Sequence, residues 1–288
     1  MKEFLKTILW ATDFSEESKV ALSHAAHLAK AFGSRLVALH VIPDFSPILY
    51  ECYGECRAEL SGTIAKSKAD AEAKLAEWEK SPDVHFEKTL VIPGSTAQVI
   101  VETATKEKAN LIVIGRKGFS DHEKTLIGGV AHQILRSTPV PVLVTHRQGP
   151  APGVKKILVP TDFTAHEDVE RNYAWKLAKG LDASICLLYV MELFGHDFRL
   201  ADEMFDAVMK KLKSRRRKEH EDIEITEDVT RAVHAYEGII DYAETKGYGM
   251  IVMSTQVRKF ARFFLGSTTE KVVTLSTLPV FAIPPDRD

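Results

Sequence analysis

Residues 6–14 read KTILWATDF and residues 155–163 read KKILVPTDF, so one short motif occurs twice in a chain of 288 residues. In each copy an apolar run leads into Thr-Asp-Phe. Three further motifs recur in the same order: RLVALHVI (35–42) with ASICLLYV (183–190), LIVIG (111–115) with MIVMS (250–254), and PVLVTH (141–146) with PVFAIPP (279–285). Motifs that recur in one order indicate the duplication of a single unit.

The two copies are joined by RQGPAPG (147–153), a segment rich in glycine and proline of the kind that links domains. A length of 288 residues fits two domains of ordinary size. The apolar share of 45% and the charged share of 27% are typical of globular proteins. We therefore predict a first domain over residues 1–147 and a second over 154–288.

Each copy alternates short apolar runs with longer segments of helical character. In the first copy we expect strands over 6–12, 35–42, 84–92, 110–114 and 140–145, and helices from Ser15, over 57–80, over 95–108 and from 129. Strands that alternate with helices predict a parallel sheet with helices on both faces. The predicted fold class is α/β, with two tandem Rossmann-like domains, each built on a five-stranded parallel sheet. Ligands of such sheets bind at the carboxyl ends of the strands, where the strand order reverses.

One loop of the first copy has the pattern of a phosphate-binding segment. It reads GRKGFSDHEKTLIGG over residues 115–129 and follows the apolar run LIVI. Glycine lets the backbone approach a ligand closely, and a helix N-terminus presents N–H groups and a positive dipole to phosphate. Three cations add positive charge to this loop: Arg116, Lys117 and Lys124. The alternative is a surface loop whose glycines only form turns.

The spacing G-x2-G-x9-G after a strand that ends in LIVIG resembles the ATP-binding motif of the universal stress protein family. ILWATDFS (8–15) and ILVPTDFT (157–164) resemble that family's first strand and its aspartate, and PVLV resembles its fifth strand. The resemblance extends over nearly the whole chain as two tandem domains. It implies the adenine nucleotide alpha hydrolase-like form of the Rossmann-like fold.

The resemblance also implies site residues in the first copy. Asp13 would face the adenine and ribose of a nucleotide, and Val41 would contact the adenine through backbone atoms. The ribose and phosphates would lie on the loop and the helix that follows it: Gly115, Arg116, Lys117, Gly118, Gly128, Gly129 and Val130. The family usually has Ser or Thr where this chain has Gly129. A hydrogen bond to a charged group contributes roughly 1.5–3 kcal/mol, so the missing hydroxyl would weaken binding by about 10- to 100-fold.

The second copy departs from the motif in another way. Ser254 and Val257 replace the first two glycines, and the spacer before Gly266 has eight residues instead of nine. A β-branched valine is a poor substitute where the backbone must approach phosphate. We therefore expect a degenerate second site, or one for a different anion, among the following residues: Asp162, Val190, Gly266, Ser267 and Thr268.

The function that the resemblance implies is that of a cytoplasmic stress-response protein. It would bind ATP, or AMP or ADP, with or without Mg²⁺, in the first domain, and act as a sensor or regulator. No general base or metal cage for phosphoryl transfer is evident, so we predict no catalytic residue, although weak ATP hydrolysis stays open. Two alternatives remain: a nucleotide-free interaction module, and an adenylate-forming or hydrolytic enzyme that would need further catalytic motifs.

The last strand of each copy, 140–146 and 279–285, is expected at a sheet edge, where unpaired backbone groups favour a second strand. Family members dimerise through this strand. In a tandem chain the two strands can pair with each other and form an intramolecular pseudo-dimer of the two domains. Two such chains can then associate as a homodimer.

Other classes of partner and site are not expected. A net charge of −2 gives no general attraction to nucleic acid or membranes, and no run reaches the ~20 apolar residues of a membrane span. Three scattered cysteines and a charged N-terminus, without a signal peptide, fit a reducing cytoplasm. Cys52 and Cys56 are weak candidates for metal ligands, and the basic stretch 211–220 is expected to be a solvated helix face.

Overall fold

The structure is a computed structural model that describes residues 4–43, 57–118, 127–149, 152–163, 167–192, 201–214, 222–255 and 265–284. The chain divides into two compact units, one over residues 2–140 and one from Pro141 to the C-terminus. Lys124, Val257, Cys52 and Cys56 lie outside the described residues. None of the described helices is both long and apolar enough to cross a bilayer.

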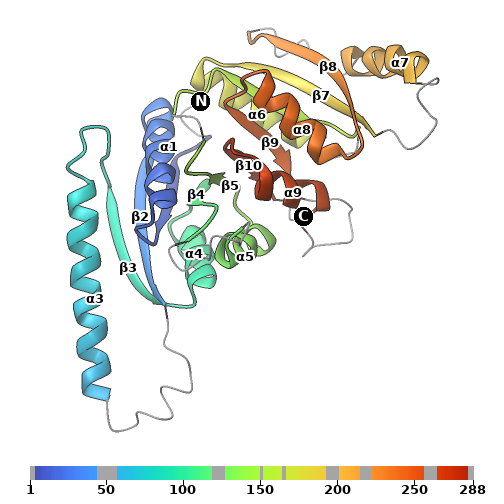
Figure 1. Cartoon of the computed structure of the whole chain (residues 1–288). Coiled ribbons are helices and arrows are strands. Elements are labelled where there is room, and N and C mark those ends of the chain that lie inside the picture. Colours follow the sequence, from blue (N-terminus) through green and yellow to red (C-terminus); the bar gives the residue numbers. More distant parts are fainter. Residues whose placement is uncertain are drawn as a thin grey trace. The chain divides into compact units, whose positions relative to one another are not determined.

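The first unit alternates strands and helices as the sequence predicts. Its elements are β1 (Thr7–Thr12), α1 (Glu16–Phe32), β2 (Arg35–Pro43), α3 (Arg57–Trp78), β3 (Lys88–Gly94), α4 (Thr96–Lys106), β4 (Leu111–Gly115) and α5 (Gly129–Ser137). The strands run parallel in the order β3-β2-β1-β4. In Figure 1 the long helix α3 runs beside β3. Because the chain passes from β1 to β2 on one side and places β4 on the other, the order reverses between β1 and β4.

The core of this unit is built around the central strand β1, every residue of which is buried. Trp10 is fully buried, and its Nε1 donates to the Ser18 carbonyl at 2.9 Å. Phe86 stacks on the Trp10 ring at 5.6 Å between centroids. Phe86 lies in the expected third strand, which in the structure begins only at Lys88, because the segment before it turns.

Helix α1 starts and ends where its sequence signals predict. Ser15 is the N-cap and its Oγ accepts from the Ser18 N–H, while Glu16 and Glu17 fill the first turn. Gly33 ends the helix with a φ of 66°, a left-handed conformation that glycine adopts at low cost. These caps fix the start of α1 directly after β1, which positions the residues between them.

The second unit repeats the alternation. It contains β5 (Val142–Thr145), β6 (Lys156–Pro160), α6 (Glu167–Leu181), β7 (Ser184–Glu192), α7 (Ala201–Ser214), β8 (Ile225–Ala232), α8 (Ala235–Thr245), β9 (Met250–Ser254), α9 (Ser267–Leu275) and β10 (Val280–Ile283). Strands β10, β9, β6, β7 and β8 are parallel neighbours in that order. β5, from the end of the first repeat, pairs antiparallel with β10, and Leu143 lies opposite Phe281.

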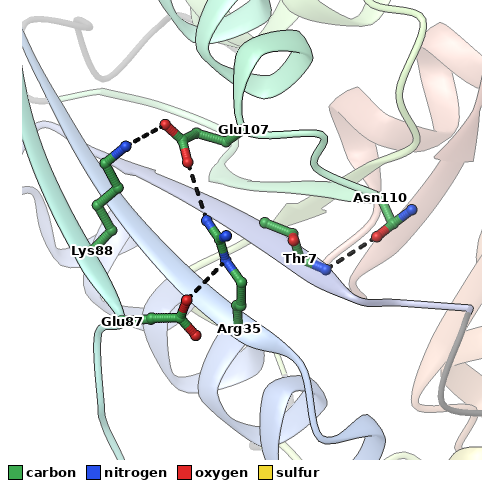
Figure 2. Close-up of polar contacts among 6 residues, drawn as sticks. All are labelled: Thr7, Arg35, Glu87, Lys88, Glu107 and Asn110. Carbon is green, nitrogen blue, oxygen red and sulfur yellow. Dashed lines mark hydrogen bonds and ion pairs between the residues drawn. The ribbon is translucent and has the colours of Figure 1, made fainter.

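A polar network holds the amino ends of the first unit's strands together (Figure 2). The Glu107 carboxylate, at the end of α4, bonds Lys88 at 2.6 Å and Arg35 at 3.1 Å. Beside it, Asn110 Oδ1 accepts from the backbone N–H of Lys6 at 2.9 Å and of Thr7 at 3.0 Å. The junction between α4 and β4 is thereby fixed to β1, β2 and β3 at the edge opposite to the candidate nucleotide loop.

Candidate nucleotide site

The candidate site lies where β1 and β4 end side by side. Asp13 follows β1, and the loop from Gly115 follows β4, so both leave the sheet at its carboxyl edge. Helix α1 begins three residues after Asp13 and contacts β4. The reversal of strand order therefore brings the first predicted site residue and the predicted phosphate loop to the same helix N-terminus.

Asp13 is exposed and shapes the turn into α1. Its Oδ1 accepts from the Ser15 backbone N–H at 3.0 Å and from the Ser15 hydroxyl at 2.6 Å. Phe14 between them has a φ of 65°, and its N–H donates to Thr12 Oγ1 at 2.9 Å. The carboxylate is thus held in a defined orientation at the strand end before any ligand is considered.

An aromatic group lies next to Asp13. The Phe14 ring packs against the His40 ring of β2 at a tilt of 35°, with 4.6 Å between centroids, and Lys74 Nζ of α3 lies 5.1 Å from the centre of the Phe14 ring. His40 Nδ1 donates to the Thr12 carbonyl at 2.8 Å. Burial lowers the pKa of His40, against the opposing effects of that hydrogen bond and of the Asp13 charge. The imidazole is therefore neutral at pH 7, with Nε2 as its acceptor nitrogen.

Gly115 at the end of β4 packs against the start of α1. A Cβ at this position would lie 2.9 Å from both the carbonyl carbon and the Cβ of Glu17. Real Cβ atoms do not approach backbone atoms so closely. A glycine is therefore required here by the fold itself, in addition to any role toward a ligand.

Glu17 fixes the next part of the loop. Its side chain is buried, and Oε2 accepts from the Lys117 backbone N–H at 2.7 Å. Arg116 between the two contact points is 8% exposed, and burial lowers its pKa while the Glu17 charge raises it. The Glu17 carboxylate thus offsets part of the Arg116 charge, so the buried Arg116 mainly supports the start of the loop.

A backbone hydrogen bond closes the loop. The Gly128 N–H donates to the Arg116 carbonyl at 2.8 Å, which brings the start of α5 next to the end of β4. Gly128 is the N-cap of α5 and, as a glycine, has no side chain with which to cap this helix terminus. Gly129 and Val130 at its first turn are exposed, and a Cβ on Gly129 would meet nothing within 4 Å. The first N–H groups of α5 are therefore presented at the carboxyl edge of the sheet.

The structure thus brings most predicted residues of the first site together. The loop and helix residues Gly115 to Lys117 and Gly128 to Val130 are joined by the closing bond, and Glu17 joins them to the turn that holds Asp13. Gly118 is half-buried one residue further along the loop. Val41 is 5% exposed in β2 and lies one position beyond His40.

The second unit has hydrogen bonds that correspond to those of the first loop, made by different residues. The Gly266 N–H donates to the Thr255 carbonyl at 2.8 Å, which corresponds to the closing bond of the first loop. The Ser254 N–H donates to the Glu170 carboxylate at 2.7 Å, so an acid of the helix after the first strand again holds the loop. Ser267 is exposed at the start of α9, and Thr268 is half-buried.

The aromatic pair also recurs in the second unit. Phe163, with a φ of 60°, stacks on Tyr189 at 4.9 Å, and Lys211 Nζ lies 4.1 Å over the Phe163 ring. The predicted Asp162 is exposed before Phe163, and Val190 follows Tyr189 in β7. Both units therefore retain the strand-end geometry, although only the first retains the glycine spacing.

Sequence reasoning missed Glu17, Glu170 and the aromatic pairs. In the sequence, Glu17 can be recognised only as an acid in the first turn of a helix, where its charge is favourable. Its true contact is one hundred residues away in sequence. The repeated Phe of the Thr-Asp-Phe motif was the one available signal for the aromatic pairs.

The family model described as the universal stress protein family matches residues 5–146 and residues 153–284, which together make up nearly the whole chain. Universal stress protein MJ0531 of Methanocaldococcus jannaschii is 34% identical over 145 residues, with 49% of this chain and 82% of that protein covered. A universal stress protein of Thermus aquaticus is 31% identical over 139 residues, with 48% and 97% covered.

Among solved structures, that of a universal stress protein from Archaeoglobus fulgidus resembles the chain with a TM-score of 0.67. The two are 21% identical, and the match covers 96% of this chain and 98% of the other. This likeness shows that the fold predicted from the sequence, two tandem α/β domains with mostly parallel sheets, is correct.

Proposed function

The chain belongs to the universal stress protein family, and from that premise we propose that its first domain binds ATP, or the related AMP or ADP, as a sensor or regulator in a stress response. The observation that carries the proposal is the closed loop between β4 and α5. It joins a helix N-terminus whose N-cap is a glycine to the carboxyl end of the sheet at the reversal of strand order. Such a terminus attracts phosphate through its N–H groups and its dipole.

Each part of the nucleotide would contact a different element of the first unit. Asp13 and the backbone at Val41 would meet the ribose and the adenine. The phosphates would lie on Gly118 and on the first turn of α5, at Gly128 to Val130. Gly115 and Arg116 would support the loop, since both pack against Glu17. We propose no residue as a ligand of Mg²⁺, which would enter bound to the nucleotide phosphates.

The space around Gly129 supports this arrangement. A phosphate needs room at the helix start, and a Cβ on Gly129 would meet nothing within 4 Å. The position is thus open to a ligand, but it lacks the hydroxyl that the resemblance leads us to expect there. The nucleotide would be held by backbone groups, so we expect a lower affinity than a serine or threonine at this position would give.

We propose a different role for the second domain. Its loop replaces two glycines with Ser254 and Val257, so it would not hold a nucleotide in the same way. The antiparallel pairing of β5 with β10 supports an intramolecular pseudo-dimer of domains 1–147 and 154–288. Homodimerisation of the chain and a cytoplasmic location belong to the same proposal.

The runner-up is a nucleotide-free interaction module. It is favoured by one observation, that Gly115 is already required by its contact with Glu17 and needs no ligand to explain it. A slow ATP hydrolase is a third candidate, which multiple-turnover phosphate release would support.

The experiment compares the purified wild-type chain with Gly118→Val, which copies the substitution found in the second repeat. Each protein is denatured and the released nucleotide is identified by mass spectrometry. We expect an adenine nucleotide from the wild type and none from the variant, with unchanged circular dichroism. Equal amounts from both proteins would show that the loop assignment is wrong.

A further inference from the structure

An open cavity of about 520 Å³ lies at the amino ends of the strands in the second unit. Its lining includes Val154 and Lys155 before β6, Lys156 as the first residue of β6, Tyr248 and Gly249 before β9, and Thr277 before β10. Asp162 and Ser267 lie at the other ends of the strands, so this cavity is distinct from either nucleotide loop.

The corresponding place in the first unit is filled by a side chain. In the repeat, Lys6 and Thr7 correspond to Lys155 and Lys156, and Asn110 corresponds to Gly249. Asn110 Oδ1 accepts from the Lys6 N–H at 2.9 Å and from the Thr7 N–H at 3.0 Å, and Figure 2 shows the second of these bonds. The oxygen of one side-chain amide group therefore accepts from two consecutive backbone N–H groups at this edge of the first sheet.

The backbone around this position is the same in both units. The Asn110 N–H donates to the Thr7 carbonyl at 2.8 Å, and the Gly249 N–H donates to the Lys156 carbonyl at 2.9 Å. In both units the first residue of the first strand pairs with the first residue of the second, Thr7 with Arg35 and Lys156 with Ser184. The second unit thus differs by the absence of the Asn side chain and not by its backbone course.

Two backbone donors consequently face the cavity. In the first unit the equivalent N–H groups, of Lys6 and Thr7, donate to Asn110 Oδ1, and at the equivalent position of the second unit Gly249 offers no side-chain acceptor to Lys155 and Lys156. An oxygen atom in the place of Asn110 Oδ1 would accept from both. The Lys156 ammonium lies nearby, bonded to the Lys246 carbonyl at 3.4 Å and 6.0 Å from the centre of the Tyr248 ring.

The rest of the lining suits an organic molecule with an apolar part. The Tyr248 ring, Leu278 and Val154 supply apolar surface. Burial raises the pKa of Tyr248, so its phenol remains uncharged at neutral pH. Glu244 also lines the cavity, but its Oε1 is engaged by the Thr277 N–H at 3.1 Å and hydroxyl at 2.8 Å.

We propose that this cavity binds a small organic carboxylate, with one carboxylate oxygen on the N–H groups of Lys155 and Lys156 and the apolar part of the molecule against Tyr248. A carboxylate is preferred to phosphate because its trigonal oxygen resembles the amide oxygen of Asn110, which accepts from the two equivalent N–H groups in the first unit. The ammonium of Lys156 adds a charge that a carboxylate satisfies and a neutral amide does not. The site is independent of the proposed nucleotide site.

The test uses the full ¹⁵N-labelled chain and sodium benzoate as the probe. The amide signals of Lys155 and Lys156 should shift along a saturable curve with benzoate, and not with sodium chloride or inorganic phosphate at matched ionic strength. Gly249→Asn, which restores the first unit's own acceptor, should abolish these shifts. Lys156→Met should weaken benzoate binding by about tenfold through loss of the charge-assisted contact.

A reciprocal variant controls for folding defects in the second unit, because a Cβ on Gly249 would lie 3.2 Å from Val154 Cα. Asn110→Gly should open the corresponding position in the first unit and create benzoate-dependent shifts at Lys6 and Thr7. The proposal is overturned by shifts that chloride or phosphate reproduces, or by benzoate shifts that persist in a folded Gly249→Asn variant.

Discussion

The Glu17 carboxylate accepts a hydrogen bond of 2.7 Å from the Lys117 backbone N–H and thereby ties the start of α1 to the loop after β4. The same first turn excludes any side chain at position 115, because Glu17 and Gly115 are in direct contact. The turn that orients Asp13 and the loop proposed to hold phosphate are thus one connected structure.

Glu17→Ala should destabilise the chain and weaken nucleotide binding together. The substitution removes a buried acceptor from the Lys117 N–H and a compensating charge from beside Arg116, at a cost of about 1–3 kcal/mol. Chemical denaturation and ATP titration measure the two effects. Glu17→Gln is the matched control, since it keeps an acceptor oxygen and should retain more of the stability. Equal behaviour of the two variants and the wild type would mean that this contact does not support the loop.

Gly115→Ala should lower stability, whereas Gly129→Ala should not. At position 115 the added methyl group would lie 2.9 Å from backbone, and at position 129 it would meet nothing within 4 Å. Overpacking of this kind costs typically about 1–3 kcal/mol. Thermal unfolding of the two variants checks the difference. If both melt like the wild type, the tight contact between β4 and α1 is not present in solution.

Gly129→Ser should raise the affinity for ATP by about 10- to 100-fold, because it adds a hydroxyl donor to a charged phosphate at an open position. Gly129→Ala separates this effect from the change in backbone flexibility and should leave the affinity within a few-fold. Isothermal titration of ATP into each variant provides the comparison. A serine variant that binds no better than the alanine variant would place the phosphates away from the start of α5.

Glu107→Gln should cost about 1 kcal/mol of stability at pH 7, since Lys88 and Arg35 are partly exposed partners. The hydrogen bond from Lys88, with that from Arg35, holds the pKa of Glu107 below its ordinary value of 4.5. The unfolded chain therefore binds a proton first as the pH falls, and the stabilisation disappears from about pH 4.5 downward. Urea denaturation of both proteins should give curves that converge in acid. A stability difference that persists below the folded-state pKa would contradict this role.

Most of the fold could be predicted from local sequence signals. The repeated Thr-Asp-Phe motif and the cap at Ser15 correctly indicated a strand followed directly by a helix. The start of β3 was misjudged because Phe86 carries apolar character that the sequence alone assigns to a strand, whereas it packs on Trp10 from the irregular segment before the strand. Periodicity does not distinguish these two ways of burying an aromatic side chain.

The candidate site was predictable only in outline. Glycine spacing marked the loop, but the reason for Gly115 depends on a side chain of another helix, which no local pattern reveals. The replacement of Asn110 by Gly249 at the equivalent position of the second repeat is likewise explained only by contacts in the folded chain. It is visible in the aligned repeats, but its meaning depends on the two N–H groups that Asn110 Oδ1 satisfies.

Calorimetric titration of ATP into the purified full chain, after removal of any co-purified nucleotide, tests the central proposal most directly. We predict a saturable heat with a stoichiometry of one ATP per chain, because the first loop keeps its glycines and the second has replaced two of them. The absence of heat at millimolar ATP would contradict nucleotide binding, and a stoichiometry of two would contradict the assignment of the site to the first domain alone.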